Sequence, residues 1–187
     1  MAMSEEKLVL VNFLDKAIGE ETKMETHRKG LLHRAFSVFL YNGNQMLIQK
    51  RAAGKYHSAG LWANTCCSHP RIGEKLENAV ERRLLEEAGI KCPVEHLTSF
   101  VYRETFGELS EYELDHVFVG EYEGAFYCNL EEIEEMKYID IDELAEDMIL
   151  FPDKYAAWFL TAFPIVYKYI LMKIKKKEVS DIGKDER

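Results

Sequence analysis

Short runs of apolar and β-branched residues, separated by turn-forming residues, recur through the first half of the chain and are typical of β-strands. Residues 8–11 form one run, and residues 35–41 and 45–49 form two more. The tripeptide Asn-Gly-Asn at 42–44 separates the last two runs, which therefore predict a β-hairpin. Residues 23–32 are polar and basic, and for them we predict a connector.

A helical interval between apolar positions appears in one central segment. The side chains that would share one face of this helix are Leu76, Val80, Leu84 and Ala88. Gly89 follows where such a helix would stop, and Pro93 prevents it from resuming. We predict a helix over residues 75–88, with an apolar face toward the core and a charged face opposite.

The second half of the chain predicts further strands and helices. The expected strands cover residues 61–65, 98–105, 112–122 and 138–141, and the expected helices cover residues 142–148 and a segment that starts at 151–153, with a possible bend at Pro164. The elements interleave without a regular strand–helix–strand repeat. The fold class is therefore expected to be α/β (α+β), with a mixed β-sheet sandwiched between helices. We predict one domain over residues 1–175 and a charged, disordered tail over residues 176–187.

Length, composition and charge agree with one soluble domain. The chain has 187 residues, 47% of them hydrophobic, and shows neither a secretory segment nor an apolar run long enough for a membrane span. Its four cysteines lack a C-x-x-C spacing, which favours free thiols in a reducing cytoplasm. The net charge of −9 argues against nucleic-acid and membrane partners, so an anionic substrate must meet local cations or metal. We expect a cytoplasmic monomer or weak homodimer.

The charged face of the central helix admits two interpretations. Charge alone favours a solvated face with i,i+4 ion pairs, such as Arg83 with Glu87. Alternatively, residues 68–90 resemble the Nudix box, a loop–helix–loop that holds divalent metal on a diphosphate. The positions that fit are Glu74, Arg82, Leu84, Glu86, Glu87, Gly89 and Ile90. Ser68 and Arg83 depart from the pattern, and a cation in place of a box carboxylate would weaken hydrolytic metal binding.

Residues 64–70, with the sequence Asn-Thr-Cys-Cys-Ser-His-Pro, narrow this resemblance. They are similar to the cysteine motif of the type 1 isopentenyl-diphosphate isomerases, which are built on the Nudix fold. The resemblance covers roughly residues 23–165. It implies the isomerisation of isopentenyl diphosphate to dimethylallyl diphosphate in isoprenoid biosynthesis, with the isoprenoid diphosphate as the small-molecule partner.

The same resemblance implies a divalent-metal site of histidines and glutamates. A single histidine is more often an ordinary surface or hydrogen-bonded residue than a ligand. Two glutamates two positions apart on a strand share one face, where they repel each other unless a cation lies between them; a solvent-facing acidic strand is the alternative. The implied ligands are His27, His33, His69, Glu111 and Glu113. Mn²⁺, Zn²⁺ and Mg²⁺ all suit such a set.

The isomerisation adds a proton at one carbon and removes one from another. The resemblance implies Cys67 and Glu113 as the acid/base pair on opposite faces of the substrate, with Tyr102 beside the Glu113 carboxylate. Protonation of an alkene produces a carbocation, which the ring face of Trp158 would stabilise, although core packing is an equally good role for this side chain. Cys66 would face away as a small buried hydrophobe.

The diphosphate requires cations, and the family positions that would contact it are Lys23, Arg51, Lys55 and Arg83. A guanidinium at Arg83 grips phosphate bidentately without activating water. Glu87 would hold a second ion, Mg²⁺, that bridges to the phosphates. Two rival functions remain: a Nudix hydrolase that cleaves a diphosphate with Glu86 and Glu87 as metal ligands, and a catalytically inactive fold that only binds a diphosphate.

Overall fold

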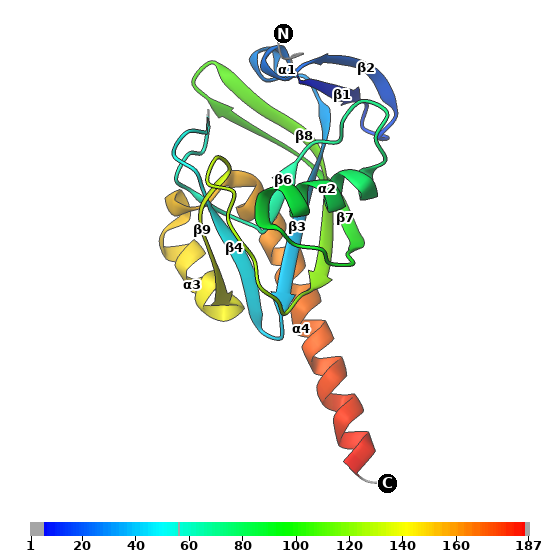
Figure 1. Ribbon diagram of the computed structural model, residues 1–187, viewed down its shortest axis with the longest axis vertical. Helices are drawn as coiled ribbons and strands as arrows, with labels where there is room; N and C mark the ends of the chain where they lie inside the picture. Colours follow the sequence, from blue (N-terminus) through cyan, green and yellow to red (C-terminus); the bar gives the residue numbers. More distant parts are fainter. Residues whose placement is uncertain (1–5, 56, 186–187) are drawn as a thin grey trace.

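The computed structural model describes residues 6–55 and 57–185, with side chains described as far as Val179 (Figure 1). The strands are β1 (Lys7–Val11), β2 (Ala17–Thr22), β3 (His33–Asn42), β4 (Gln45–Arg51), β5 (Trp62–Ala63), β6 (Cys66–Ser68), β7 (Glu95–Phe106), β8 (Leu109–Glu121) and β9 (Ile133–Asp140). The helices are α1 (Lys23–Lys29), α2 (Leu76–Ala88), α3 (Ile141–Leu150), the short 3₁₀ helix η1 (Pro152–Lys154) and α4 (Ala157–Asp185).

β3 is the central strand of a mixed sheet. β8 runs parallel to it, with His33 opposite Glu113. Along the opposite edge, β1, β6 and β4 pair antiparallel with successive parts of β3. β9 extends the sheet beyond β4, and β7 extends it beyond β8. This order places the start of β3, the cysteine strand β6 and the acidic half of β8 next to one another. The predicted hairpin over residues 35–49 and the predicted strands over residues 98–105 and 112–122 are confirmed.

Helices cover both faces of the sheet, as Figure 1 shows with α2 in front and α4 behind. α2 packs its apolar face on one core, which includes Val38 of β3. α3 and α4 pack on a second core, which includes Phe39 of β3. Adjacent residues of a strand point to opposite faces, so one strand supplies both cores. The predicted mixed sheet between helices is confirmed.

α2 and its end also agree with the prediction. The helix begins after Lys75 and ends at Gly89, whose φ is 66°. Glycine adopts this left-handed conformation without the steric cost that a Cβ brings.

The connector predicted over residues 23–32 is wrong, because α1 occupies Lys23–Lys29. The Thr22 side chain caps this helix by accepting a hydrogen bond from the Glu25 N–H, and Gly30 ends it with a φ of 58°. A helix of seven residues is too short to show an apolar period, so only its caps are visible in the sequence.

Two strand predictions also need correction. β2 was not predicted, because four of its six residues are exposed and it lacks an apolar run. The strand predicted over residues 61–65 is interrupted: Trp62–Ala63 forms β5, and the adjacent cysteines lie on a separate strand, β6. Cys67 pairs with Ser37 of β3, which fixes the orientation of the thiol.

The C-terminal helix differs from the prediction at both ends. Residues 152–154 form the 3₁₀ helix, and α4 begins at Ala157. α4 continues to Asp185, through the residues for which the sequence predicts a disordered tail. Although the sequence pattern predicts no membrane span, Ala157–Val179 is long and apolar enough to be one by length and composition. Within this helix, Phe159, Ala162 and Val166 are fully buried against the sheet. The domain limit at residue 175 stays a prediction.

Candidate active site

A pocket of about 130 Å³ is lined by residues from β3, β4, β6, β7, β8, α1, α2 and α4. The predicted site residues on its wall are Lys23, Arg51, Lys55, Cys67, His69, Arg83, Glu87, Tyr102, Glu111, Glu113 and Trp158. The two remaining predicted residues, His27 and His33, belong to an adjoining cluster that shares His69 and Glu111 with the pocket. The fold therefore brings all the predicted residues to one place.

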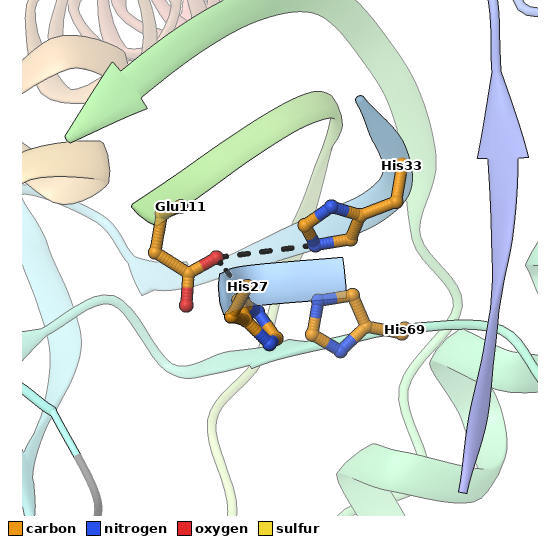
Figure 2. Close-up of side chains that lie close together, drawn as sticks. All are labelled: His27, His33, His69 and Glu111. Carbon is orange, nitrogen blue, oxygen red and sulfur yellow. Dashed lines mark ion pairs between the residues drawn. The ribbon is translucent and has the colours of Figure 1, made fainter. Parts of the chain in front are cut away.

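Figure 2 shows the core of this cluster, in which His27, His33, His69 and Glu111 point toward one another. One potential ligand atom from each residue lies within 4.8 Å of the others. The Glu111 Oε2 atom is 3.2 Å from His27 Nε2 and 3.9 Å from His33 Nε2. Four separate elements supply these side chains, since His27 lies on α1, His33 starts β3, His69 follows β6 and Glu111 lies on β8.

The hydrogen bonds around the histidines fit a metal site. The Nδ1 atom of His27 is 2.6 Å from the Lys23 carbonyl oxygen, and the Nδ1 atom of His33 is 2.9 Å from the Leu31 carbonyl oxygen. Each Nδ1–H can donate to its carbonyl, so that Nε2 carries the lone pair that a cation would bind. His33 Nε2 and Glu111 Oε2 are buried atoms without a hydrogen bond, as expected for ligands that a cation would satisfy. The cluster indicates a divalent-cation site.

Glu113 adjoins the same cluster. Its Oε1 atom is 2.9 Å from His69 Nε2 and 3.4 Å from His33 Nε2. Burial and the nearby Glu111 charge oppose ionisation, but the adjacent His33 and His69 side chains outweigh them and lower the pKa of Glu113. Burial also lowers the pKa of His69 to about 4, so that ring stays neutral, as a metal ligand must.

His57 is a site residue that sequence reasoning missed. Its Nε2 atom lies 2.6 Å from Glu111 Oε1, and its ring stacks on Phe106 and meets the edge of Trp158. It sits in the loop between β4 and β5, where no strand or helix period indicates its direction. The only signal available is a histidine in a glycine-containing loop next to basic residues.

Asn64 holds the thiol and the indole of the pocket in place, and it was also missed. Its Oδ1 accepts hydrogen bonds from Cys67 Sγ at 2.9 Å and from Trp158 Nε1 at 3.2 Å. Its Nδ2 donates to the carbonyl oxygens of Val38 and Cys66, both at 3.0 Å. Because every polar atom of the amide has a partner, the side chain is rigid. Its position as the first residue of the cysteine motif at residues 64–70 is the sequence feature that could have identified it.

The two adjacent cysteines have different surroundings. Burial, followed by the negative charge of Asp115, raises the pKa of the Cys67 thiol well above its usual range, so the sulfur keeps its proton. Cys66 is fully buried in the core beneath α2. Successive residues of β6 point to opposite sides, which agrees with the expectation that Cys66 faces away from the pocket.

Tyr102 lies beside the Glu113 carboxylate, as the family resemblance implies. The two residues are opposite each other on β7 and β8, and the Tyr102 hydroxyl donates to Glu113 Oε2 at 2.7 Å. Burial and the Glu113 charge raise the pKa of Tyr102 well above its usual range, so the phenol remains a donor.

The cations of the pocket are held by carboxylates. Arg83 contacts Glu87 Oε1 at 2.5 Å and Glu132 Oε1 at 3.2 Å, and Lys55 also pairs with Glu132. The Arg83–Glu87 ion pair that charge pattern alone suggests is therefore present, and it lies in the pocket. Glu132, which follows no recognisable motif, was missed. Arg51 lies over the Trp158 ring, with its Cζ 5.2 Å from the ring centroid.

The first half of the box forms a separate clamp. Glu74 accepts two hydrogen bonds of 2.8 Å from the Arg82 guanidinium, and one from the Arg71 N–H. The hydrogen bond from Arg82 is the main reason that the pKa of Glu74 falls to about 2. This clamp fixes the loop that enters α2, and therefore the position of Arg83.

A comparison with protein families matches the NUDIX domain over residues 31–159. Among curated relatives, isopentenyl-diphosphate Delta-isomerase 2 of Photorhabdus laumondii is 48% identical over 157 residues, which cover 83% of this chain and 89% of that protein. The isopentenyl-diphosphate Delta-isomerase of Serratia proteamaculans is 43% identical over 159 residues, which cover 84% and 89% of the two chains.

Solved structures share the fold at lower sequence identity. A crystal structure from Deinococcus radiodurans superposes with a TM-score of 0.70 at 18% identity and covers 85% of this chain and 98% of its own. A MutT protein from Methanosarcina mazei superposes with a TM-score of 0.59 at 18% identity, with coverage of 74% and 94%. At this identity the likeness concerns the fold alone.

Proposed function

This chain belongs to the NUDIX family and, within it, to the isopentenyl-diphosphate Delta-isomerases, and we propose that its pocket isomerises isopentenyl diphosphate to dimethylallyl diphosphate with Cys67 and Glu113 as the acid/base pair. One observation carries the assignment: a thiol that keeps its proton and an ionised carboxylate line one pocket. A 1,3-proton shift needs one group to add a proton and another to remove one.

The positions of the two groups are supported by their neighbours. Asn64 orients the Cys67 thiol, and Tyr102 orients the Glu113 carboxylate. Neither side chain can swing away without losing a buried hydrogen bond, so both are preorganised for proton transfer. The pair exchanges donor and acceptor roles between the forward and reverse reactions.

The histidine–glutamate cluster fits a divalent cation, and we assign His27, His33, His69, Glu111 and Glu113 as the residues that would hold it. Mn²⁺, Zn²⁺ and Mg²⁺ all accept this mixture of imidazole and carboxylate. A bound ion would polarise the Glu113 carboxylate and hold it in its ionised form. Glu87, fully buried beside Arg83, would hold Mg²⁺ together with the diphosphate.

Trp158 would protect the cationic intermediate. Its indole is 4% exposed, and its N–H points to Asn64 and Cys67. The N–H edge of the ring therefore lies beside the thiol that would add the proton. A ring face directed at the substrate would stabilise positive charge without offering a nucleophile. Burial of this wall also limits the access of water to a carbocation.

The diphosphate would bind to Lys23, Arg51, Lys55 and Arg83. In the structure Glu132 neutralises Lys55 and Arg83, and Glu6 pairs with Lys23 at 3.1 Å. A diphosphate offers the same cations more oxygen acceptors than these carboxylates do, so it would displace them. In a chain with a net charge of −9, these four side chains supply the local positive charge that an anionic substrate needs. The same negative charge disfavours nucleic-acid and anionic-membrane partners, and we propose a cytoplasmic monomer or weak homodimer.

The decisive experiment incubates the purified protein with isopentenyl diphosphate and Mg²⁺ in D₂O and follows the products by NMR. We expect dimethylallyl diphosphate that carries deuterium, because the added proton comes from a group that exchanges with solvent. Release of inorganic phosphate without an allylic isomer would indicate that the protein is a diphosphate hydrolase. If the substrate stays unchanged, also after addition of Mn²⁺ or Zn²⁺, the result would indicate that the protein only binds a diphosphate.

A further inference from the structure

A second group of metal-binding side chains lies on the β7–β8 hairpin, and none of its members lines the active-site pocket. His96 and Ser99 come from β7, and His116 comes from β8. Asp15 reaches the group from the turn between β1 and β2. The proposed isomerase reaction has no role for these residues.

A β-bulge brings the two β7 residues together. Residues three positions apart on a regular strand point to opposite faces. The register between β7 and β8 shifts between His96 and Thr98, so one extra residue is inserted and His96 turns to the face of Ser99. Ser99 is directly opposite His116 on the neighbouring strand. Bulges commonly re-aim a side chain in this way at functional sites.

The donor atoms of the three side chains form a small triangle. Ser99 Oγ is 3.0 Å from both His96 Nε2 and His116 Nδ1, and the two nitrogens are 3.4 Å apart. Two imidazole nitrogens bound to one tetrahedral cation at about 2.0–2.1 Å are separated by about 3.4 Å. The nitrogens therefore already have the separation of two ligands, whereas 3.4 Å is long for a hydrogen bond between them.

Asp15 prepares His116 for this role. Its Oδ2 atom is 3.2 Å from His116 Nε2, on the side of the ring away from the triangle. Arg34 donates hydrogen bonds to Asp15 Oδ1 at 2.7 Å and to the Asp15 carbonyl oxygen at 2.8 Å. These bonds hold Asp15 in a left-handed backbone conformation, with a φ of 57°. A carboxylate beside Nε2 favours the proton on that nitrogen and leaves the Nδ1 lone pair for a metal.

The group is open on one side. His116 is 9% exposed, whereas His96 and Ser99 are exposed, so an ion can enter from solvent and water can complete its coordination. The edge-on contact of the His96 and Phe118 rings, with centroids 5.3 Å apart, restrains the exposed ligand. Two imidazoles with a hydroxyl suit borderline transition metals such as Zn²⁺, Cu²⁺ and Ni²⁺ better than Mg²⁺.

We propose that His96, His116 and Ser99 form a second metal site, for a Zn²⁺-class transition-metal ion, with Asp15 as the carboxylate that orients His116. An ion bound there joins β7 to β8 across the bulge. Through Asp15 and Arg34 it also connects this hairpin to the β1–β2 turn. The site is independent of the isomerase reaction.

Equilibrium dialysis against Zn²⁺ tests the proposal, with the metal per chain measured by atomic emission. We expect the wild-type protein to retain one equivalent more than His96→Ala, while both keep the same isomerase turnover and the same circular dichroism spectrum. Glu104→Ala, which removes an exposed carboxylate from the same strand, is the matched control and should bind as much as the wild type. Equal Zn²⁺ content in the wild type and His96→Ala would refute the site.

The role of Asp15 is tested separately by Asp15→Asn with Co²⁺ as a spectroscopic probe. Asparagine tolerates the left-handed backbone at this position, so the change removes charge without adding strain. Loss of a carboxylate that supports a ligating histidine lowers metal affinity about 10- to 100-fold. A visible Co²⁺ absorption that titrates with the wild-type affinity in Asp15→Asn would contradict the orienting role.

Discussion

Burial sets the properties of the single side chains in the pocket. Cys67 keeps its proton because the thiolate would lose its hydration, and Asn64 then receives the S–H hydrogen bond. Glu113 is also buried but sits among histidines, and it stays ionised. The intrinsic acidities already favour a protonated thiol and an ionised carboxylate at neutral pH, and the neighbours of the two groups widen this difference.

Cys67→Ala and Glu113→Gln should each lower isomerase turnover by about 100- to 10,000-fold, which is the usual contribution of a positioned acid or base. Glu113→Gln is nearly isosteric and Cys67→Ala removes a single heavy atom, so circular dichroism should show an intact fold. Turnover of isopentenyl diphosphate measured by NMR gives the comparison.

Two matched variants separate this effect from a general loss of stability. Cys66→Ala removes the neighbouring thiol that lies in the core, and Glu108→Gln neutralises an exposed carboxylate near the start of β8. Both controls should retain most of the turnover. If Cys67→Ala behaves like Cys66→Ala, the thiol has no acid/base role.

The Glu74–Arg82 clamp predicts a pH-dependent stability. Folding lowers the pKa of Glu74 from 4.5 to about 2, so its stabilisation is complete above pH 4.5 and disappears as the pH falls through 2. Glu74→Gln should lower the free energy of unfolding by about 1 kcal/mol at pH 7, the upper range for a partly exposed pair. Urea denaturation at pH 7 and pH 3.5 should show the difference from the wild type becoming smaller in acid. Glu81→Gln, an exposed change on α2, should show no such trend, and a Glu74→Gln difference that is constant with pH would refute the linkage.

At the scale of elements, β8 carries the chemistry through its alternation. Glu111, Glu113 and Asp115 occupy every second position, and all three are buried. Asp115 accepts a hydrogen bond of 2.7 Å from the Ser37 hydroxyl, and burial raises its pKa well above the usual range. Three buried strand positions that would normally hold apolar residues therefore hold acids, and the adjacent histidines and hydroxyl groups stabilise them.

The end of α2 offers a test of an element boundary. Gly89 has a φ of 66°, and an added Cβ would lie 2.5 Å from a Tyr127 ring carbon. Gly89→Ala should therefore destabilise the protein by more than the roughly 1–2 kcal/mol that a left-handed alanine costs. Chemical denaturation gives the measurement.

Gly43→Ala is the matched control for this effect. Gly43 has a φ of 57° and no heavy atom within 4 Å of an added Cβ, so the change tests backbone strain alone. Equal destabilisation by both substitutions would show that the Tyr127 ring moves aside without cost and that the close contact at Gly89 is unimportant.

At the scale of the whole molecule, the histidine–glutamate cluster joins segments that are far apart in the chain. His27, His69 and Glu111 lie on α1, after β6 and on β8. An ion bound there connects the N-terminal helix to the middle of the sheet. Metal occupancy should therefore stabilise the fold as well as the reaction.

Removal of divalent metal should lower the melting temperature. A ligand at about 100 times its Kd contributes about 2.7 kcal/mol. For a chain of this size that free energy corresponds to roughly 5–10 °C. Differential scanning calorimetry of His96→Ala, with and without a chelator, isolates the active-site cluster from the second proposed site. Adding Glu111→Gln to that background should abolish the effect, and an unchanged melting temperature in the His96→Ala protein would show that the cluster holds no metal.

Much of the fold and part of the site follow from short-range patterns in the sequence. The 35–49 hairpin, the 75–88 helix with its stop at Gly89 and the shared face of Glu111 and Glu113 depend on periods and turn residues a few positions apart. Such features are encoded locally, so the sequence alone determines them. Helix α1 was not predicted because its seven residues are too few to show an apolar period, although both of its caps are present in the sequence.

The tertiary structure alone decided which distant side chains meet. His57 faces Glu111, Asn64 binds Trp158, Glu132 joins Arg83, and His96 approaches His116 only because a bulge shifts the β7 register. No local propensity specifies a pairing register between strands or the path of a loop, because both result from the packing of the whole chain. Burial, which raises the pKa of the Cys67 thiol, is likewise a property of the assembled molecule.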